Sequence, residues 1–164
     1  MGSEPLSEIV IQAALEDFPL LERWVAMLAA RFQLPPALAH RFDLCVTELV
    51  TNAIDYGYAD GRRGTVKVRF WFQPDQIIIR IDDDGTPFDP TSHVLPYLPR
   101  SLAEATIGGR GIRLVRHHAD EIRYQRAAGL NQVTLVFRPA TARQLRSAES
   151  DGLADAPRVP ADSG

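Results

Sequence analysis

The sequence predicts an α+β fold, in which helices and strands form one mixed domain followed by a tail. The chain has 164 residues, 45% of them hydrophobic, which is enough for a single core. Apolar residues recur at helical intervals early in the chain, and later segments are rich in β-branched and aromatic residues. Large apolar side chains become rare after residue 138. We therefore expect the domain to span residues 1–138 and residues 139–164 to be a disordered C-terminal tail.

The first part of the chain predicts one strand and two helices. Apolar residues alternate with other residues over residues 9–13, which indicates a short strand. A proline then begins an amphipathic helix over residues 19–31. A second helix follows over residues 35–56, and Gly57 provides its C-terminal stop.

The later part of the chain predicts two hairpins that flank a third helix. Residues 65–72 and 76–81 have strand composition and a short connection that contains a proline, so they are expected to pair antiparallel. The third helix is expected to begin at Gly111. Residues 121–126 and 133–137 are expected to form the second hairpin.

Charge and composition exclude several classes of function. A net charge of -3 gives no electrostatic reason to expect nucleic acid or an anionic membrane as the partner. Cys45 is the lone cysteine, which excludes an internal disulfide framework, and no Cys/His cluster has zinc spacing. No apolar run approaches the ~18 residues of a membrane span. We therefore expect a soluble, cytoplasmic protein.

The second predicted helix carries Glu48, Asn52 and Asp55 along one edge of its apolar stripe. Glu48 and Asn52 are four residues apart and so address the same small volume. An amide oxygen suits Mg²⁺ bound beside phosphates, and a carboxylate within reach of a hydroxyl suits a general base. The alternative is that these are ordinary polar residues on a solvated helix face.

The apolar strand segment over residues 76–81 ends abruptly in Asp82, Asp83 and Asp84, followed by Gly85. Strand ends that open into loops often carry function, and Gly85 permits a backbone path close to a ligand. A carboxylate accepts hydrogen bonds only, so it can bind the exocyclic amino group of adenine. The alternatives are an acidic β-turn or a calcium site.

Glycines at residues 108, 109 and 111 stand immediately before a helical pattern. They allow backbone amides to turn towards an anion, the helix amino end adds partial positive charge, and Arg110 can add a cation. The segment is neither a Walker loop nor a Rossmann fingerprint. The alternative is a turn that merely connects two elements.

In their order and spacing, the segments 48–55, 83–89 and 108–115 resemble the N box and the two glycine boxes of the GHKL-type ATPase family, which includes sensor histidine kinases and DNA gyrase. The chain is most similar to the small anti-sigma-factor serine/threonine kinases of bacterial partner-switching systems. The resemblance covers residues 8–138. It implies a two-layer α/β sandwich of the Bergerat type, with a mixed, mostly antiparallel sheet and helices on one face.

The resemblance also assigns roles to single residues. Glu48 matches the general base, Asn52 the magnesium ligand, and Asp83 the residue that contacts the adenine amino group. Pro87 replaces the second glycine of the family's Asp-x-Gly-x-Gly motif and stiffens that loop. Thr134 fits the family's hydroxyl near the adenine, although a strand threonine has an equally good structural explanation. The residues expected to bind ATP are Asn52, Asp55, Asp83, Gly85, Pro87, Phe88, Gly108, Gly109, Arg110, Gly111, Ile112 and Thr134.

The activity implied by the resemblance is transfer of the γ-phosphoryl group of ATP, with magnesium, to a serine or threonine of a STAS-domain antagonist. The implied partners are that antagonist and a sigma factor or other output regulator, and the relatives imply a homodimer. Residues 90–107 would form the ATP lid. The alternatives are a non-catalytic nucleotide-binding module that sequesters a partner, and a detached ATPase domain of a two-component system.

Overall fold

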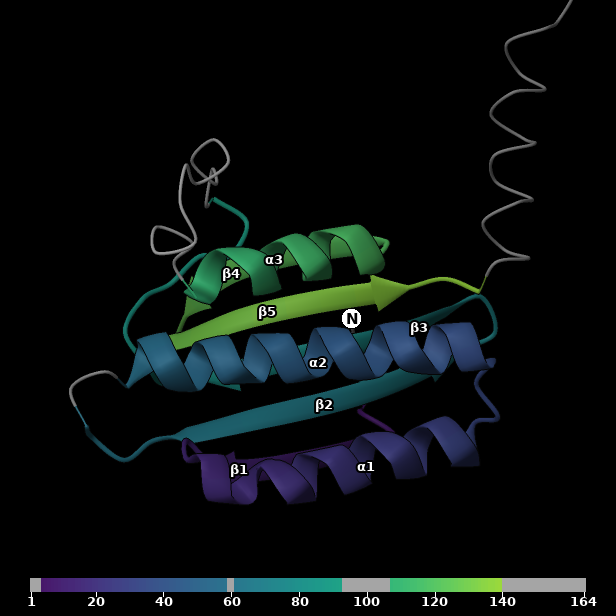
Figure 1. Ribbon diagram of the computed structural model, residues 1–164, viewed down its shortest axis with the longest axis horizontal. Helices are drawn as coiled ribbons and strands as arrows, with labels where there is room; N and C mark the ends of the chain where they lie inside the picture. The colour runs from purple at the N-terminus through teal and green to yellow at the C-terminus, as the bar shows by residue number, and fades with distance from the viewer. Residues whose placement is uncertain (1–3, 59–60, 93–106, 140–164) are drawn as a thin grey trace, which may run out of the picture.

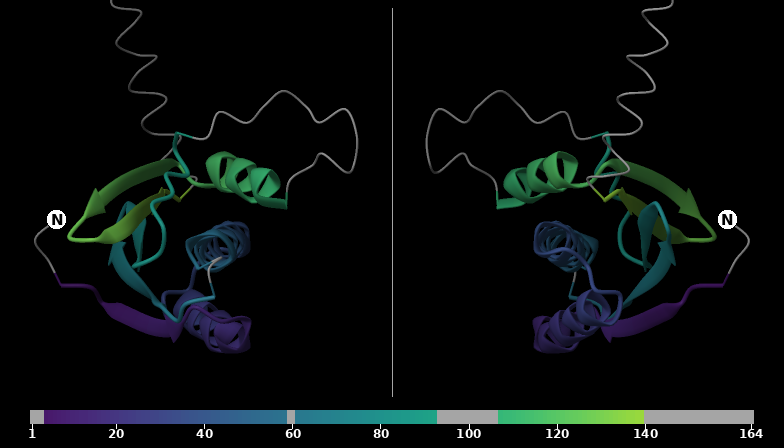
Figure 2. Two further views of the ribbon diagram at one scale, coloured as in Figure 1. Left: turned by 90° about the vertical axis from the view of Figure 1, so that its left-hand side faces the viewer. Right: turned by 90° about the vertical axis from the view of Figure 1, so that its right-hand side faces the viewer.

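The computed structural model describes residues 4–58, 61–92 and 107–139, which form a sheet covered on one face by helices (Figures 1 and 2). The sheet has five strands in the order β1-β2-β3-β5-β4, and all four pairings are antiparallel. The elements are β1 (Ser7–Gln12), a 3-10 turn η1 (Leu15–Asp17), α1 (Phe18–Arg31), α2 (Pro36–Gly57), β2 (Thr65–Gln73), β3 (Gln76–Asp83), α3 (Ile107–His118), β4 (Glu121–Ala127) and β5 (Leu130–Phe137). The predicted α+β class is confirmed, and the sheet expected to be mixed and mostly antiparallel is antiparallel throughout these strands.

Two predicted boundaries were wrong by three or more residues. The third helix begins at Ile107, four residues before the predicted start at Gly111, so four residues expected in the loop lie in its first turn. Glycine lowers helix propensity by about 1 kcal/mol, but apolar packing overrides that preference: Ile112 and Val115 are buried against the core. The last strand begins at Leu130 rather than residue 133, because the connection is a tight turn in which Ala128 and Gly129 have φ of 52° and 78°.

The core lies between the sheet and α2, the central helix of the covering layer in Figure 1. Phe42 of α2 is fully buried and packs its ring 6.0 Å from Phe70 of β2 and 6.2 Å from Phe137 of β5, measured between ring centroids. One aromatic side chain thus joins the helix to two strands that are not neighbours in the sheet. These aromatic contacts fix the position of α2 over the middle of the sheet.

The C-terminal end of α2 lies directly against the loop that follows β3. The amide of Thr86 donates to the carbonyl of Gly57 at 3.0 Å. A Cβ added to Gly85 would lie 2.7 Å from the Cα of Gly57 and 2.7 Å from Oδ1 of Asp83. Gly85 is therefore required for the two backbones to approach this closely, whereas a Cβ on Gly57 would lie 3.3 Å from the Cα of Gly85.

No described helix is both long and apolar enough to cross a membrane. The predicted tail lies almost entirely outside the described residues, which end at 139.

Gly85→Ala should lower the free energy of unfolding by about 1–3 kcal/mol, because the new methyl group collides with backbone and forces the loop away from α2. Urea denaturation monitored by circular dichroism measures this change. Gly129→Asn is the matched control, since Gly129 has open space around it and asparagine tolerates its positive φ. Equal stability of Gly85→Ala and the wild type would show that the loop does not need this close approach.

Candidate functional site

A small cavity lies between α2, the ends of β3 and β5, and the loop that follows β3. Its volume is about 20 Å³, close to that of a single water. Polar groups enter it from three elements: Asn52 from α2, Asp83 from β3 and Asn131 from β5. The other lining residues are Leu49, Ala53, Gly57, Ile81, Thr86, Phe88, Pro90 and Val133.

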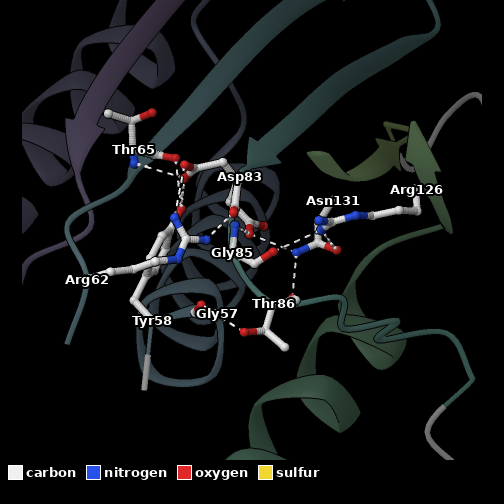
Figure 3. A network of polar contacts seen from close by, with 10 residues as sticks. Gly57, Tyr58, Arg62, Thr65, Asp83, Gly85, Thr86, Arg126 and Asn131 are labelled. Carbon is white, nitrogen blue, oxygen red and sulfur yellow. Dashed lines mark hydrogen bonds and ion pairs between the residues drawn. The ribbon is translucent and has the colours of Figure 1, made fainter. Parts of the chain in front are cut away.

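Asp83 is only 5% exposed and makes its hydrogen bonds to described residues through one oxygen. Its Oδ1 accepts from the amide of Gly85 at 2.9 Å and from Nδ2 of Asn131 at 2.8 Å (Figure 3). Its Oδ2 accepts no hydrogen bond from a described residue. Burial raises the pKa of Asp83, and the bonds to Oδ1 only partly oppose this shift. The cavity therefore contains a desolvated carboxylate with one unused acceptor.

Asn131 lines this cavity and was not identified by the sequence analysis. It is 2% exposed and pairs with Asp83 in the register of β3 and β5. Its Nδ2 also donates to the carbonyl of Thr86 at 2.9 Å, and its Oδ1 accepts from Tyr124 and Arg126 at 2.9 and 2.8 Å (Figure 3 shows the bonds to Asp83, Thr86 and Arg126). One side chain thereby fixes both Asp83 and the loop. Asparagine is uncommon in strands, and the sequence carries no signal for this role because the expected strand began at residue 133.

Thr134, expected near the adenine, does not reach this cavity. In β5 the side chains of Val133, Leu135 and Phe137 face the helices and the core. Because side chains alternate along a strand, Thr134 faces the opposite side of the sheet, where its register partners are Arg80 and Arg123. The position opposite Asp83 belongs to Asn131 instead.

Glu48 and Asn52 of α2 face the first turns of α3. A Cβ on Gly111 would collide with Oε2 of Glu48 and lie 3.3 Å from Nδ2 of Asn52, so a larger residue would displace the Glu48 carboxylate. Asn52 is 6% exposed, and its buried Nδ2 has no hydrogen-bond partner among the described residues. An unpaired buried amide of this kind costs about 1–3 kcal/mol, which points to a polar ligand.

The remaining predicted site residues differ in whether they are buried, exposed or lining the cavity. Residues 108–110 belong to the first helical turn of α3, where backbone amides lack intrahelical partners. Ile112 is buried in the core, whereas Asp55 and Pro87 are exposed. Phe88 lines the cavity and stacks on Tyr56, with ring centroids 5.5 Å apart. Residues 93–106 of the predicted lid lie outside the described residues.

The three consecutive aspartates point in different directions. Asp82 lies on the face of the sheet away from the helices, where it pairs with Arg69 and, at 2.8 Å, with Arg80. Asp84 accepts from the hydroxyl of Tyr58 at 2.5 Å, and this bond lowers the pKa of Asp84. Only Asp83 enters the cavity. The carboxylates do not converge, and no group of three potential ligands exists among the described residues, so the calcium alternative loses its support.

Comparisons with known proteins identify the family to which this chain is similar. The family model of the histidine kinase-like ATPase domain matches residues 11–137. The serine/threonine-protein kinase BtrW of Bordetella bronchiseptica is 33% identical over 126 residues, which cover 77% of this chain and 82% of the relative. The anti-sigma F factor of Clostridium novyi is 30% identical over 62% of this chain and 72% of its own length.

Other similarities cover smaller parts of the compared proteins. The serine-protein kinase RsbW of Bacillus subtilis is 30% identical over 91 residues, and the match spans 53% of this chain and 57% of the relative. A crystal structure of the RsbU and RsbW domains of Rv1364c from Mycobacterium tuberculosis superposes with a TM-score of 0.59 at 17% identity, over 83% of this chain and 32% of that one. This structural likeness supports the fold.

The predicted resemblance to anti-sigma-type protein kinases is confirmed by these relatives, and the predicted ATP-binding fold by the family model. The chain belongs to the histidine kinase-like ATPase domain family.

Proposed function

We propose that this protein is an anti-sigma-type regulatory kinase that transfers the γ-phosphoryl group of ATP to a serine or threonine of a STAS-domain antagonist. The observation that carries the proposal is the meeting of two incompletely paired polar groups in one cavity, Oδ2 of Asp83 and the amide of Asn52. A nucleotide supplies partners for both groups. The relatives named as serine kinases support the activity.

Asp83 forms the adenine end of the proposed site. Its free Oδ2 is an acceptor, so it suits the exocyclic amino group of adenine and repels the carbonyl of guanine. Asn131 and Gly85 hold the other oxygen and so fix the direction of the free one. The cavity is much smaller than the ~300–1,000 Å³ of typical ligand pockets, so the site must widen when a purine enters.

Asn52 and Glu48 form the phosphate end. Asn52 would hold Mg²⁺ through its side-chain oxygen, since the ion takes one or two protein oxygens and completes its coordination with water and phosphate. The unpaired Nδ2 of Asn52 is a donor, so it suits a phosphate oxygen rather than the metal. When bound, the ion would neutralise charge on the β- and γ-phosphates. The first turn of α3 directs free backbone amides to the same phosphates.

Glu48 is the proposed general base. The acceptor hydroxyl of the partner loses its proton to Glu48 as its oxygen attacks the γ-phosphorus, and the bond from that phosphorus to the β-γ bridging oxygen breaks. The products are the phosphorylated partner and ADP. The phosphate-binding end of α3 holds the leaving phosphates in place, so most of the catalysis is positioning.

The partners belong to the proposal as well. A STAS-domain antagonist is the substrate, and a sigma factor or similar output regulator is the protein held when the antagonist is phosphorylated. The anti-sigma F factor among the relatives supports this pair of partners. We further propose that the kinase acts in the cytoplasm as a homodimer.

Glu48→Gln should lower the rate of phosphoryl transfer to a STAS protein by about 100-fold or more, because the amide cannot accept the hydroxyl proton. Transfer is measured with magnesium, labelled ATP and a candidate STAS protein, and ATP binding should change by less than about twofold. Asp43→Asn is the control, since Asp43 is an exposed carboxylate on the same helix.

The outcomes of this experiment separate the candidate functions. Equal transfer by Glu48→Gln and the wild type would remove Glu48 as the base. ATP binding without transfer to any STAS candidate would favour the sequestering module, and transfer only to a histidine protein would favour the two-component alternative.

Asp83→Asn should weaken ATP binding at least about tenfold, or 1.4 kcal/mol, in isothermal titration calorimetry. The asparagine oxygen can still accept from Gly85 and Asn131, but its NH₂ group now faces the donor of adenine. Because burial raises the pKa of Asp83, its ionised form costs folding stability as the pH rises above the unfolded pKa. The variant should therefore be at least as stable as the wild type at pH 7. An unchanged ATP affinity would place the adenine elsewhere.

A further inference from the structure

Arg116 connects α3 to the chain segment that follows the Asp83 loop. Its Nη2 donates to the backbone carbonyl of Pro90 at 3.2 Å and to that of Thr91 at 2.6 Å. Both acceptors are main-chain atoms, so the contact fixes backbone position. Nothing in the family boxes covers Arg116, which lies five residues after Gly111.

The anchored segment forms part of the cavity wall. Pro90 is buried and lines the cavity together with Phe88, facing Asn52 and Asp83. Immediately beyond it, the amide and hydroxyl of Thr91 donate to Oδ1 of Asp89 at 2.7 and 2.6 Å, which makes a compact turn. Arg116 therefore binds a segment that is already locally ordered. Because Pro90 belongs to this segment, the position of the cavity wall is coupled to that of Arg116.

The helix that carries Arg116 is fixed at the other end of the site. Val115, beside Arg116, is fully buried, and Gly111 lies in contact with Glu48 of α2. Arg116 thus relates the adenine-side wall, through α3, to the residues proposed to act on the phosphates. Arg116 is thus one determinant of the distance between these two halves of the site, beside the hydrogen bond from the amide of Phe88 to Oδ1 of Asn131 at 3.3 Å.

We propose that Arg116 is a positioning residue for nucleotide binding, which holds the Phe88–Pro90 wall at the distance from α3 that a bound purine requires. The inference rests on the proposed ATP-dependent function. Arg116 acts through the carbonyls of Pro90 and Thr91 and does not itself contact the nucleotide. Its loss should therefore weaken binding of every adenine ligand by a similar factor and leave the chemical step intact.

The test compares Arg116→Ala, Arg116→Lys and Arg113→Ala with the wild type. Arg113→Ala is the matched control, because Arg113 is exposed on the same helix, carries the same charge and makes no hydrogen bond or ion pair with a described residue. Dissociation constants for adenosine, ADP and ATP are measured by competition. The rate of phosphoryl transfer is measured at saturating ATP, and the unfolding temperature by circular dichroism.

Arg116→Ala should raise all three dissociation constants by about tenfold, with an unchanged rate at saturating ATP and an unfolding temperature within about 2 °C of the wild type. Arg116→Lys should recover part of the affinity, because an ammonium group can still donate to the carbonyls. Arg113→Ala should bind all three ligands as the wild type does.

Other results overturn the inference. A loss of affinity confined to ADP and ATP would make Arg116 a phosphate contact. Equal losses of affinity in Arg116→Ala and Arg113→Ala would show that the missing positive charge, rather than the missing hydrogen bonds, causes the effect. Wild-type affinity in Arg116→Ala would show that the Phe88–Pro90 segment keeps its position without the hydrogen bonds from Arg116. A wild-type protein that binds no adenine ligand would instead refute the proposed function, so the two failures are distinguishable.

Discussion

The close approach of the end of α2 to the end of β3 is the constraint on which the site depends. Gly57 and Gly85 permit this approach, and the hydrogen bond from Thr86 to Gly57 holds it. Because the two backbones touch here, Asn52 on the helix and Asp83 on the strand line one cavity. A side chain at Gly85 would separate the two groups that the proposed nucleotide must bridge.

Local patterns were sufficient to predict the residues that lie on a single element. Helical spacing placed Glu48 and Asn52 together, and the strand end singled out Asp83. The role of Asn131 could not be predicted, because it depends on the register that places it opposite Asp83. The same register turns Thr134 away. The start of α3 was missed because glycines are turn signals locally, whereas tertiary packing decided the helix.

The run of three aspartates shows how burial separates identical side chains. Asp82 is shielded but paired with two arginines, and Asp84 is held by Tyr58 and Arg62, so both are satisfied within the chain. Asp83 has the raised pKa of a carboxylate that is desolvated without an adjacent cation of comparable effect. Only the incompletely satisfied member is available to a ligand, and composition alone cannot identify it.

The site therefore costs stability that the rest of the fold must offset. An unpaired buried amide at Asn52 and a desolvated carboxylate at Asp83 are both unfavourable, each by an amount that a few core contacts can balance. The cost is placed where α2 is held most firmly, between the Phe42 aromatic contacts and the Gly57 junction. Held there, the two groups present their unused hydrogen-bonding atoms to the cavity, where a complementary ligand can pair with both. Rigidity of the helix and strand is thus what makes these polar groups a binding site.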